Sequence, residues 1–144
     1  YNPFRDEMFT AKKGAGAFCN GKPMRASAAP GLSRSVIAVG TSPYDRQYAD
    51  SNFELFRKVY GRCEDIRRTG SAALDLAYVA AGRLEGYFER NLKPWDFAAG
   101  ILLVTEAGGR VSGWDGKALF PLENADVAAA APAVFDELLD ILRA

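Results

Sequence analysis

Two carboxylates seven residues apart are the side chains with the clearest chemical potential in this sequence. Asp96 precedes the apolar segment 97–104, and Glu89 ends the segment before it. A carboxylate fixed at the end of an element is the kind of ligand that a hard cation such as Mg²⁺ requires. If a strand and a helix meet at the carboxyl edge of a sheet, both carboxylates face the crevice where open α/β sheets bind ligands. Position alone favours simpler interpretations, a helix N-cap at Asp96 and a solvated side chain at Glu89.

A second candidate site lies at a predicted strand-to-helix turn. Gly70, Ser71 and Ala72 open an Ala/Leu-rich segment, and exposed backbone N–H groups at a helix start can bind phosphate or hydroxyl oxygens. Capping of the helix by Ser71 is the simpler interpretation of the same residues. The preceding pair, Arg67 and Arg68, can reach phosphate, but we favour a structural role such as a salt bridge.

The composition excludes several classes of protein. The chain has 144 residues, 49% hydrophobic and 25% charged, which is normal for a globular domain. Lys plus Arg and Asp plus Glu number 18 each, so no basic excess indicates a nucleic-acid partner. No apolar run is long enough to span a bilayer. The absence of histidine argues against a zinc site or a His-based triad, and we expect Cys19 and Cys63 to be free thiols in a cytoplasmic protein.

The elements that must position these residues alternate along the chain. We expect a hairpin within residues 6–24 and further strands at 35–40, 63–67, 83–89, 110–112 and 127–130. Helices are predicted over 50–60, 70–81, 96–107 and 133–142. The first of these is predicted from Phe53, Phe56 and Val59 at three-residue spacing, which suits an amphipathic helix, and we expect the Phe, Tyr and Leu side chains of the helices to lie in the core. The alternation predicts the α/β class, a layered domain with a mixed sheet, over residues 1–144.

Taken together, the motifs resemble those of the inositol monophosphatase family. Residues 95–100, Trp-Asp-Phe-Ala-Ala-Gly, and residues 104–109, Val-Thr-Glu-Ala-Gly-Gly, are similar to that family's second signature, W-D-x-A-A-G-x-x-x-V-x-E-A-G-G. Residues 68–73, 78–82 and 86–89 and the early hairpin also look like that family. The resemblance covers essentially the whole chain and is greatest to the bacterial inositol-1-monophosphatase type.

The resemblance implies an activity and a role for each candidate residue. The family hydrolyses phosphate monoesters with Mg²⁺, is generally inhibited by lithium, and commonly forms homodimers. Asp96 matches the aspartate that ligates the second metal near the leaving-group oxygen, and Glu89 matches the carboxylate that hydrogen-bonds substrate hydroxyls. Gly70, Ser71 and Ala72 match the backbone segment that lines the sugar or inositol pocket.

One departure from the family pattern limits what the chain is expected to do alone. The first family signature, D-P-[IL]-D-G-T, and the upstream Glu of the G-E-E segment are absent. Those residues supply most of the metal ligands in the family, and one carboxylate cannot hold two or three Mg²⁺ ions. We therefore expect the C-terminal half of the sugar-phosphatase fold, which is inactive alone and needs the N-terminal metal-binding half of the same enzyme as its partner.

Alternatives stay open for both substrate and class of function. We expect myo-inositol 1-phosphate or a related polyol phosphate as the small-molecule substrate, with histidinol phosphate, fructose 1,6-bisphosphate and 3′-phosphonucleotides as alternatives. A different class is a non-catalytic dimerisation or regulatory interaction module. The presence of both Asp96 and Glu89 argues against that class, whereas tight binding to a protein partner would favour it.

Overall fold

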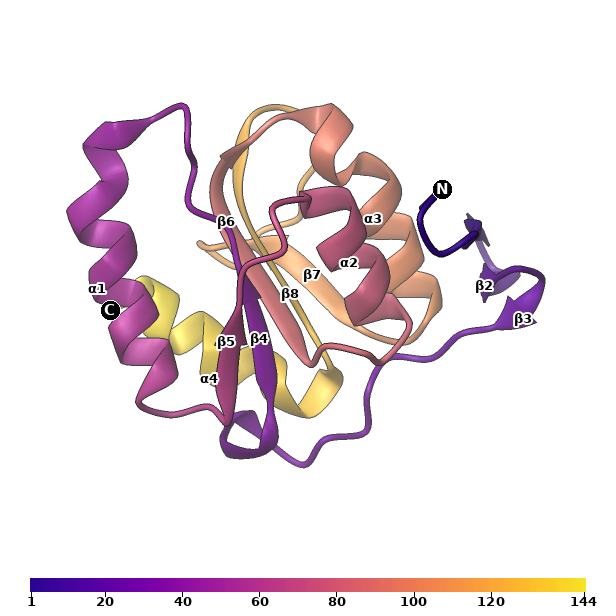
Figure 1. Cartoon of the computed structure of the whole chain (residues 1–144), viewed down its shortest axis with the longest axis horizontal. Coiled ribbons are helices and arrows are strands. Elements are labelled where there is room, and N and C mark those ends of the chain that lie inside the picture. Colours follow the sequence, from indigo (N-terminus) through magenta and orange to yellow (C-terminus); the bar gives the residue numbers. More distant parts are fainter.

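The computed structural model describes residues 1–144 and contains two β-sheets (Figure 1). A small antiparallel sheet has the order β1-β2-β3, formed by Phe9–Lys12, Gly16–Cys19 and Lys22–Pro23. The larger sheet has the order β5-β4-β6-β8-β7, formed by β4 Val36–Val39, β5 Asp65–Arg67, β6 Gly86–Leu92, β7 Arg110–Gly113 and β8 Ala125–Ala130. β5, β4 and β6 are parallel, whereas β8 and β7 are antiparallel to their neighbours. The predicted α/β class with a mixed sheet is therefore confirmed.

Four α-helices cover the two faces of the large sheet. They are α1 Ala49–Tyr60, α2 Ala72–Ala80, α3 Pro94–Glu106 and α4 Pro132–Arg143, with short 3₁₀ turns at Leu32–Arg34 and Arg46–Tyr48. α1 and α4 lie on one face and α2 and α3 on the other, while the small sheet packs on the outer side of α3 (Figure 1). None of the helices has both the length and the apolar character needed to cross a membrane.

The central strand β6 contributes to both apolar cores because its side chains alternate between the faces of the sheet. Tyr87 belongs to the core under α2 and α3, and Phe88 belongs to the core under α1 and α4. Both side chains are almost fully buried. Consecutive residues of one strand thus anchor the two helical layers to the same sheet.

Close packing of α2 against α3 depends on a residue without a side chain. A Cβ atom at Gly100 would lie 2.4 Å from Leu76 Cδ1 and 2.7 Å from Leu76 Cβ. Leu76 is fully buried, so it has no open space into which to move. Gly100 therefore sets the distance between the two helices that begin at the candidate site.

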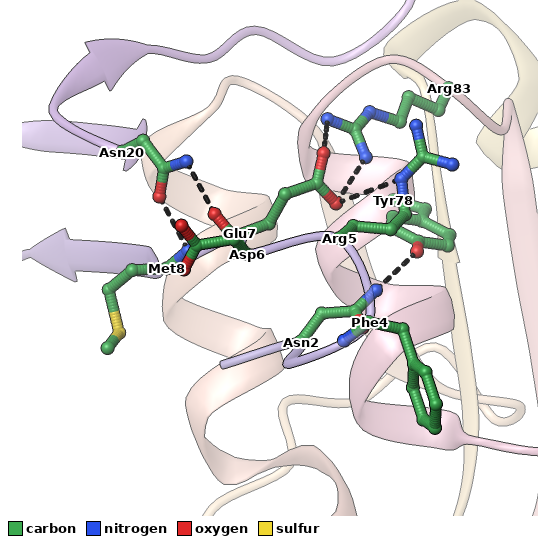
Figure 2. Close-up of polar contacts among 9 residues, drawn as sticks. All are labelled: Asn2, Phe4, Arg5, Asp6, Glu7, Met8, Asn20, Tyr78 and Arg83. Carbon is green, nitrogen blue, oxygen red and sulfur yellow. Dashed lines mark hydrogen bonds and ion pairs between the residues drawn. The ribbon is translucent and has the colours of Figure 1, made fainter.

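An ion pair between Glu7 and Arg83 attaches the N-terminal segment to the rest of the molecule (Figure 2). The guanidinium of Arg83 donates to both oxygens of Glu7 at 2.9 and 2.7 Å, which lowers the pKa of that carboxyl. Arg83 also lies over the ring of Tyr78, 5.2 Å from its centroid. The Asn2 side chain donates to the Tyr78 hydroxyl at 3.1 Å. These contacts tie the segment before β1 to α2 and to the turn that leads into β6.

A carboxylate at the end of α3 fixes the β1–β2 turn. Glu106 accepts the backbone N–H groups of Gly14 and Gly16 at 2.8 and 2.9 Å, and these bonds lower its pKa. The hairpin predicted from the sequence is present, and it is attached to the helix that carries Asp96.

The main error in the sequence prediction concerns the apolar face of α1. Phe53 was predicted to be buried with Phe56 and Val59, but its exposed fraction is 65%. Leu55 is buried in its place. The spacing of three residues gives a face that drifts around a helix of 3.6 residues per turn, so one of the three positions lies outside the buried stripe. Cys19 and Cys63 are free thiols, as predicted.

Candidate functional site

A cavity of about 750 Å³ lies at the edge where the three parallel strands end. Its lining includes every residue proposed from the sequence, namely Gly70, Ser71, Ala72, Glu89 and Asp96. These residues come from three places: the turn after β5 with the first residue of α2, the strand β6, and the first turn of α3. The carboxyl edge of parallel strands is where open α/β sheets bind ligands, so the topology brings the candidates together.

Glu89 lies within β6, which runs on to Leu92, so the prediction that it ends the strand is wrong. Both of its carboxylate oxygens have donors. The Ser42 backbone N–H donates to Oε1 at 3.0 Å, and the Tyr87 hydroxyl donates to Oε2 at 2.7 Å. Burial and the adjacent Glu89 charge raise the pKa of Tyr87, so its hydroxyl stays protonated and remains a donor.

The position of the Glu89 carboxylate also depends on a neighbouring glycine. A Cβ atom at Gly40, just after β4, would lie 1.9 Å from Glu89 Cδ and 2.0 Å from Oε2. No side chain fits at residue 40 while the carboxylate keeps this place. Glu89 is therefore oriented by two donors and by space that only glycine leaves.

Asp96 is the third residue of α3 rather than its N-cap, because the helix begins at Pro94 and Lys93 is the N-cap. Its Oδ2 atom accepts the Lys93 backbone N–H at 2.9 Å, so the carboxylate closes the start of the helix. No hydrogen bond in the chain involves its Oδ1 atom. One oxygen therefore has a structural role, and the other remains available to a ligand at the positive end of the helix.

The side chains that line the cavity provide only part of the coordination that a cation needs. The chain has no group of three or more His, Cys, Asp or Glu side chains that could hold a metal ion. Mg²⁺ commonly binds through one or two protein carboxylates together with water and substrate phosphate. Asp96 fits the role of one such carboxylate, whereas both oxygens of Glu89 are already hydrogen-bonded within the chain.

The turn that opens α2 caps the helix through Ser71 and leaves its first N–H groups without partners in that helix. Ser71 is the N-cap, and its Oγ atom accepts the backbone N–H of Leu74 at 3.4 Å, so capping is confirmed. Gly70 has a φ of 91°, in the left-handed region where glycine is favoured. The first N–H groups of a helix have no partner in that helix, and Ala72 and Ala73 both line the cavity. The turn thus offers N–H groups to an oxygen-bearing ligand.

Sequence reasoning missed a buried carboxylate beneath this turn. Asp75 in α2 is 1% exposed, and burial raises its pKa to about 6. Its Oδ1 atom accepts the hydroxyl of Thr69 at 2.7 Å. A charged residue inside the apolar segment 72–80 was the available signal.

The two arginines before the turn do not act as a pair. Arg67 forms an ion pair with Asp65, in line with the structural role favoured from the sequence. Arg68 makes a different contact: its Nε atom donates to the Thr41 hydroxyl at 3.2 Å, and its side chain does not line the cavity. The turn after β5 is thereby joined to the segment after β4.

Comparison with known proteins gives a match over almost the entire chain. The sequence model of the inositol monophosphatase family matches residues 1–143. The chain is 48% identical over 143 residues to the Nus factor SuhB of Escherichia coli (strain K12), covering 99% of this chain and 53% of that relative. It is 41% identical over 143 residues to an inositol-1-monophosphatase of Rhizobium meliloti (strain 1021), with the same two coverages. The chain spans about half the length of the curated relatives it matches.

Solved structures show the same arrangement of elements. The inositol monophosphatase from Anabaena (Nostoc) sp. PCC 7120 superposes with a TM-score of 0.89 at 39% identity, covering 99% of this chain and 56% of that chain. A dual specific IMPase/NADP phosphatase bound with D-inositol-1-phosphate superposes with a TM-score of 0.86 at 27% identity, covering 100% of this chain and 54% of that chain.

Proposed function

The chain belongs to the inositol monophosphatase family, and from that premise we propose that its protein is a Mg²⁺-dependent phosphatase of inositol 1-phosphate or a related polyol phosphate. The observation that carries the proposal is the shared cavity at the carboxyl edge of the sheet. It brings together one available carboxylate oxygen, backbone N–H groups at a helix start, and an oriented carboxylate. The available carboxylate oxygen can bind a cation, and the N–H groups can donate to ester or hydroxyl oxygens. The oriented carboxylate can accept a hydrogen bond from a sugar-like hydroxyl.

Asp96 is the proposed metal ligand, through its free Oδ1 atom. A Mg²⁺ ion held by Asp96 would supply polarisation of phosphoryl oxygens and compensation of the negative charge on the leaving oxygen. The hydrogen bond from Lys93 to Oδ2 holds the carboxylate in one orientation, so the free oxygen faces a fixed direction. We also propose that lithium inhibits the enzyme at this same metal site.

The organic part of the substrate is assigned to Glu89 and to the turn at the start of α2. A carboxylate accepts hydrogen bonds from hydroxyl groups, and Glu89 is held in place by Ser42 and Tyr87. The N–H groups of Ala72 and Ala73 donate to substrate oxygens. A polyhydroxylated ring with several donors and acceptors suits this combination better than an apolar leaving group.

The chain supplies only part of the proposed active site. Asp96 provides one ligand, and a metal-assisted phosphatase needs further ligands to position the attacking water. We propose that these come from an N-terminal half of the same enzyme and that the working protein is a homodimer. The 144 residues alone are then expected to release no phosphate.

The test measures Mg²⁺-dependent phosphate release from inositol 1-phosphate, first with the chain alone and then with the chain joined to the N-terminal half. Asp96→Asn is expected to reduce turnover of the joined protein by at least about 100-fold, because the variant loses a charged metal ligand. Asp140→Asn is the matched control, since Asp140 is an exposed carboxylate on α4, a helix outside the cavity. Equal activity of the Asp96→Asn protein and its control would contradict the assignment, as would turnover by the 144 residues alone.

A second candidate, the non-catalytic interaction module, is favoured by one comparison. The relative from Escherichia coli is named as a Nus factor and not as a phosphatase. Tight protein binding by the wild type that is unchanged in Asp96→Asn, together with no turnover, would support this candidate over the enzyme.

A further inference from the structure

The turn that lines the proposed substrate pocket is connected to the interior of the molecule by one buried carboxylate. We propose that Asp75, acting through the hydroxyl of Thr69, is a positioning residue for the substrate-binding turn Gly70–Ala72. The proposal rests on the proposed function and deepens it, because it assigns the orientation of the substrate donors to a buried carboxylate outside the family segments quoted above.

The direction of the hydrogen bonds follows from the chemistry of the groups. An ionised carboxylate only accepts, so the Thr69 hydroxyl must donate its hydrogen to Asp75 Oδ1, at 2.7 Å. The Thr69 oxygen then has its lone pairs free, and it accepts the Ser71 backbone N–H at 3.4 Å. The carboxylate, the hydroxyl and the backbone of the turn thus form a chain of two hydrogen bonds with a fixed polarity.

That chain constrains the donors of the pocket. The Ser71 N–H is directed toward Thr69, and the Ser71 Oγ atom is used by Leu74. The next N–H groups along the backbone, those of Ala72 and Ala73, are therefore the ones left for a ligand in the cavity. Gly70 takes the left-handed conformation that the bend requires.

The burial of Asp75 indicates a role beyond helix stability. A fully buried carboxylate is costly unless its hydrogen bonds compensate, and an alanine at this helical position would carry no such cost. Asp75 lies in the field of Glu89 and Tyr87 on β6 and of Arg68 before the turn. Asp96 at the start of α3 acts on the same Tyr87. Asp75 is thus part of the charged cluster behind the cavity, although it does not line the cavity itself.

Thr69→Val removes the hydroxyl that bonds to Asp75 and to the Ser71 N–H, and it keeps the shape of the side chain. In the protein that carries the N-terminal half, we expect the KM for inositol 1-phosphate to rise about 10-fold with little change in kcat, because substrate binding loses oriented donors. Thr69→Ser retains the hydroxyl and is expected to stay within about twofold of wild type. Thr105→Val is the matched control, since Thr105 is an exposed threonine on α3.

Hydrogen exchange at residues 68–74 gives a readout that does not depend on activity. The Ser71 amide is expected to exchange faster in Thr69→Val and at the wild-type rate in Thr69→Ser. If Thr69→Val fails to fold, Asp75→Leu replaces it, because leucine is close to aspartate in size and has no acceptor for the Thr69 hydroxyl, and a rise in KM with faster exchange is expected there too. Wild-type KM and wild-type exchange in the variant tested would overturn the proposal. Failure of the wild type to hydrolyse inositol 1-phosphate would count against the proposed function, while the exchange rates would still decide the role of Asp75 and Thr69.

Discussion

Gly40→Ala is the substitution that most directly tests how Glu89 is held. The new Cβ atom would lie 1.9 Å from Glu89 Cδ, whereas unstrained carbon contacts begin near ~3.5 Å. The carboxylate must therefore move by about 1.5 Å or more. Such a movement breaks the hydrogen bonds that it accepts from Ser42 and Tyr87.

The magnitude follows from what the displaced carboxylate leaves behind. Tyr87 is fully buried, and a buried hydroxyl without a partner costs about 1–3 kcal/mol. Overpacking at the new methyl group costs about 1–3 kcal/mol more. We expect the free energy of unfolding to fall by about 2–4 kcal/mol, since the two costs overlap. Misplacing a substrate-orienting group by this distance is expected to lower kcat/KM for inositol 1-phosphate by about 10- to 100-fold.

Denaturant unfolding and phosphate release are measured on the variant and on Gly61→Ala. Gly61 is the matched control, because its φ of −67° suits any residue and the nearest atom to a new Cβ would be 3.5 Å away. The decisive comparison repeats Gly40→Ala in a Glu89→Ala background, where the collision no longer exists. If Gly40→Ala costs as much stability there as in the wild type, the clash with Glu89 is not the cause and the reasoning fails.

Two further substitutions test the packing and the charge behind the site. Gly100→Ala places a methyl group within 2.4 Å of Leu76, so denaturant unfolding should show that the free energy of unfolding falls by about 1–3 kcal/mol. A fall of less than about 0.5 kcal/mol would contradict the close contact between the two helices. Asp75 has its folded-state pKa raised from 3.8 to about 6, so the stability linked to its protonation is complete below pH 4 and is lost as the pH rises through 6. Relative to the wild type, Asp75→Asn should therefore gain up to about 3 kcal/mol between pH 4 and pH 8, measured by unfolding at each pH. A difference that does not change with pH would refute the raised pKa, which arises from burial and the Glu89 charge against the opposing effects of Thr69 and Arg68.

The parts of the site that could be predicted from the sequence are those fixed by local rules. Asp96 and the Gly70–Ala72 turn stand next to recognisable helix starts, and helix starts after parallel strands meet at one edge of the sheet. The hydrogen bond between Tyr87 and Glu89 could also have been predicted from the sequence. Two residues apart on one strand, they lie on the same face of the sheet.

The remaining parts depend on contacts between distant segments. Ser42 is 47 residues from Glu89 in the chain, and Thr41 is 27 residues from Arg68. No periodicity or motif relates such positions, since the register between β4, β5 and β6 decides which of them meet. The exposure of Phe53 was missed for a related reason, because the width of a buried stripe is set by the helix packed against it rather than by spacing alone.

Three residues that violate local preferences lie close to the cavity. Asp75 is a charge in an apolar helix, Gly70 bends the chain where a strand meets that helix, and Gly40 leaves a gap that Glu89 fills. Each departure would be costly as an isolated choice, but Asp75 accepts a hydrogen bond from Thr69 and the space beside Gly40 is filled by Glu89. A fold under selection for stability alone has no need of a buried carboxylate under a turn or of a missing side chain beside another carboxylate. Their occurrence at one sheet edge is the physical argument for the proposal that the ligand binds at this edge rather than in another hollow on the surface.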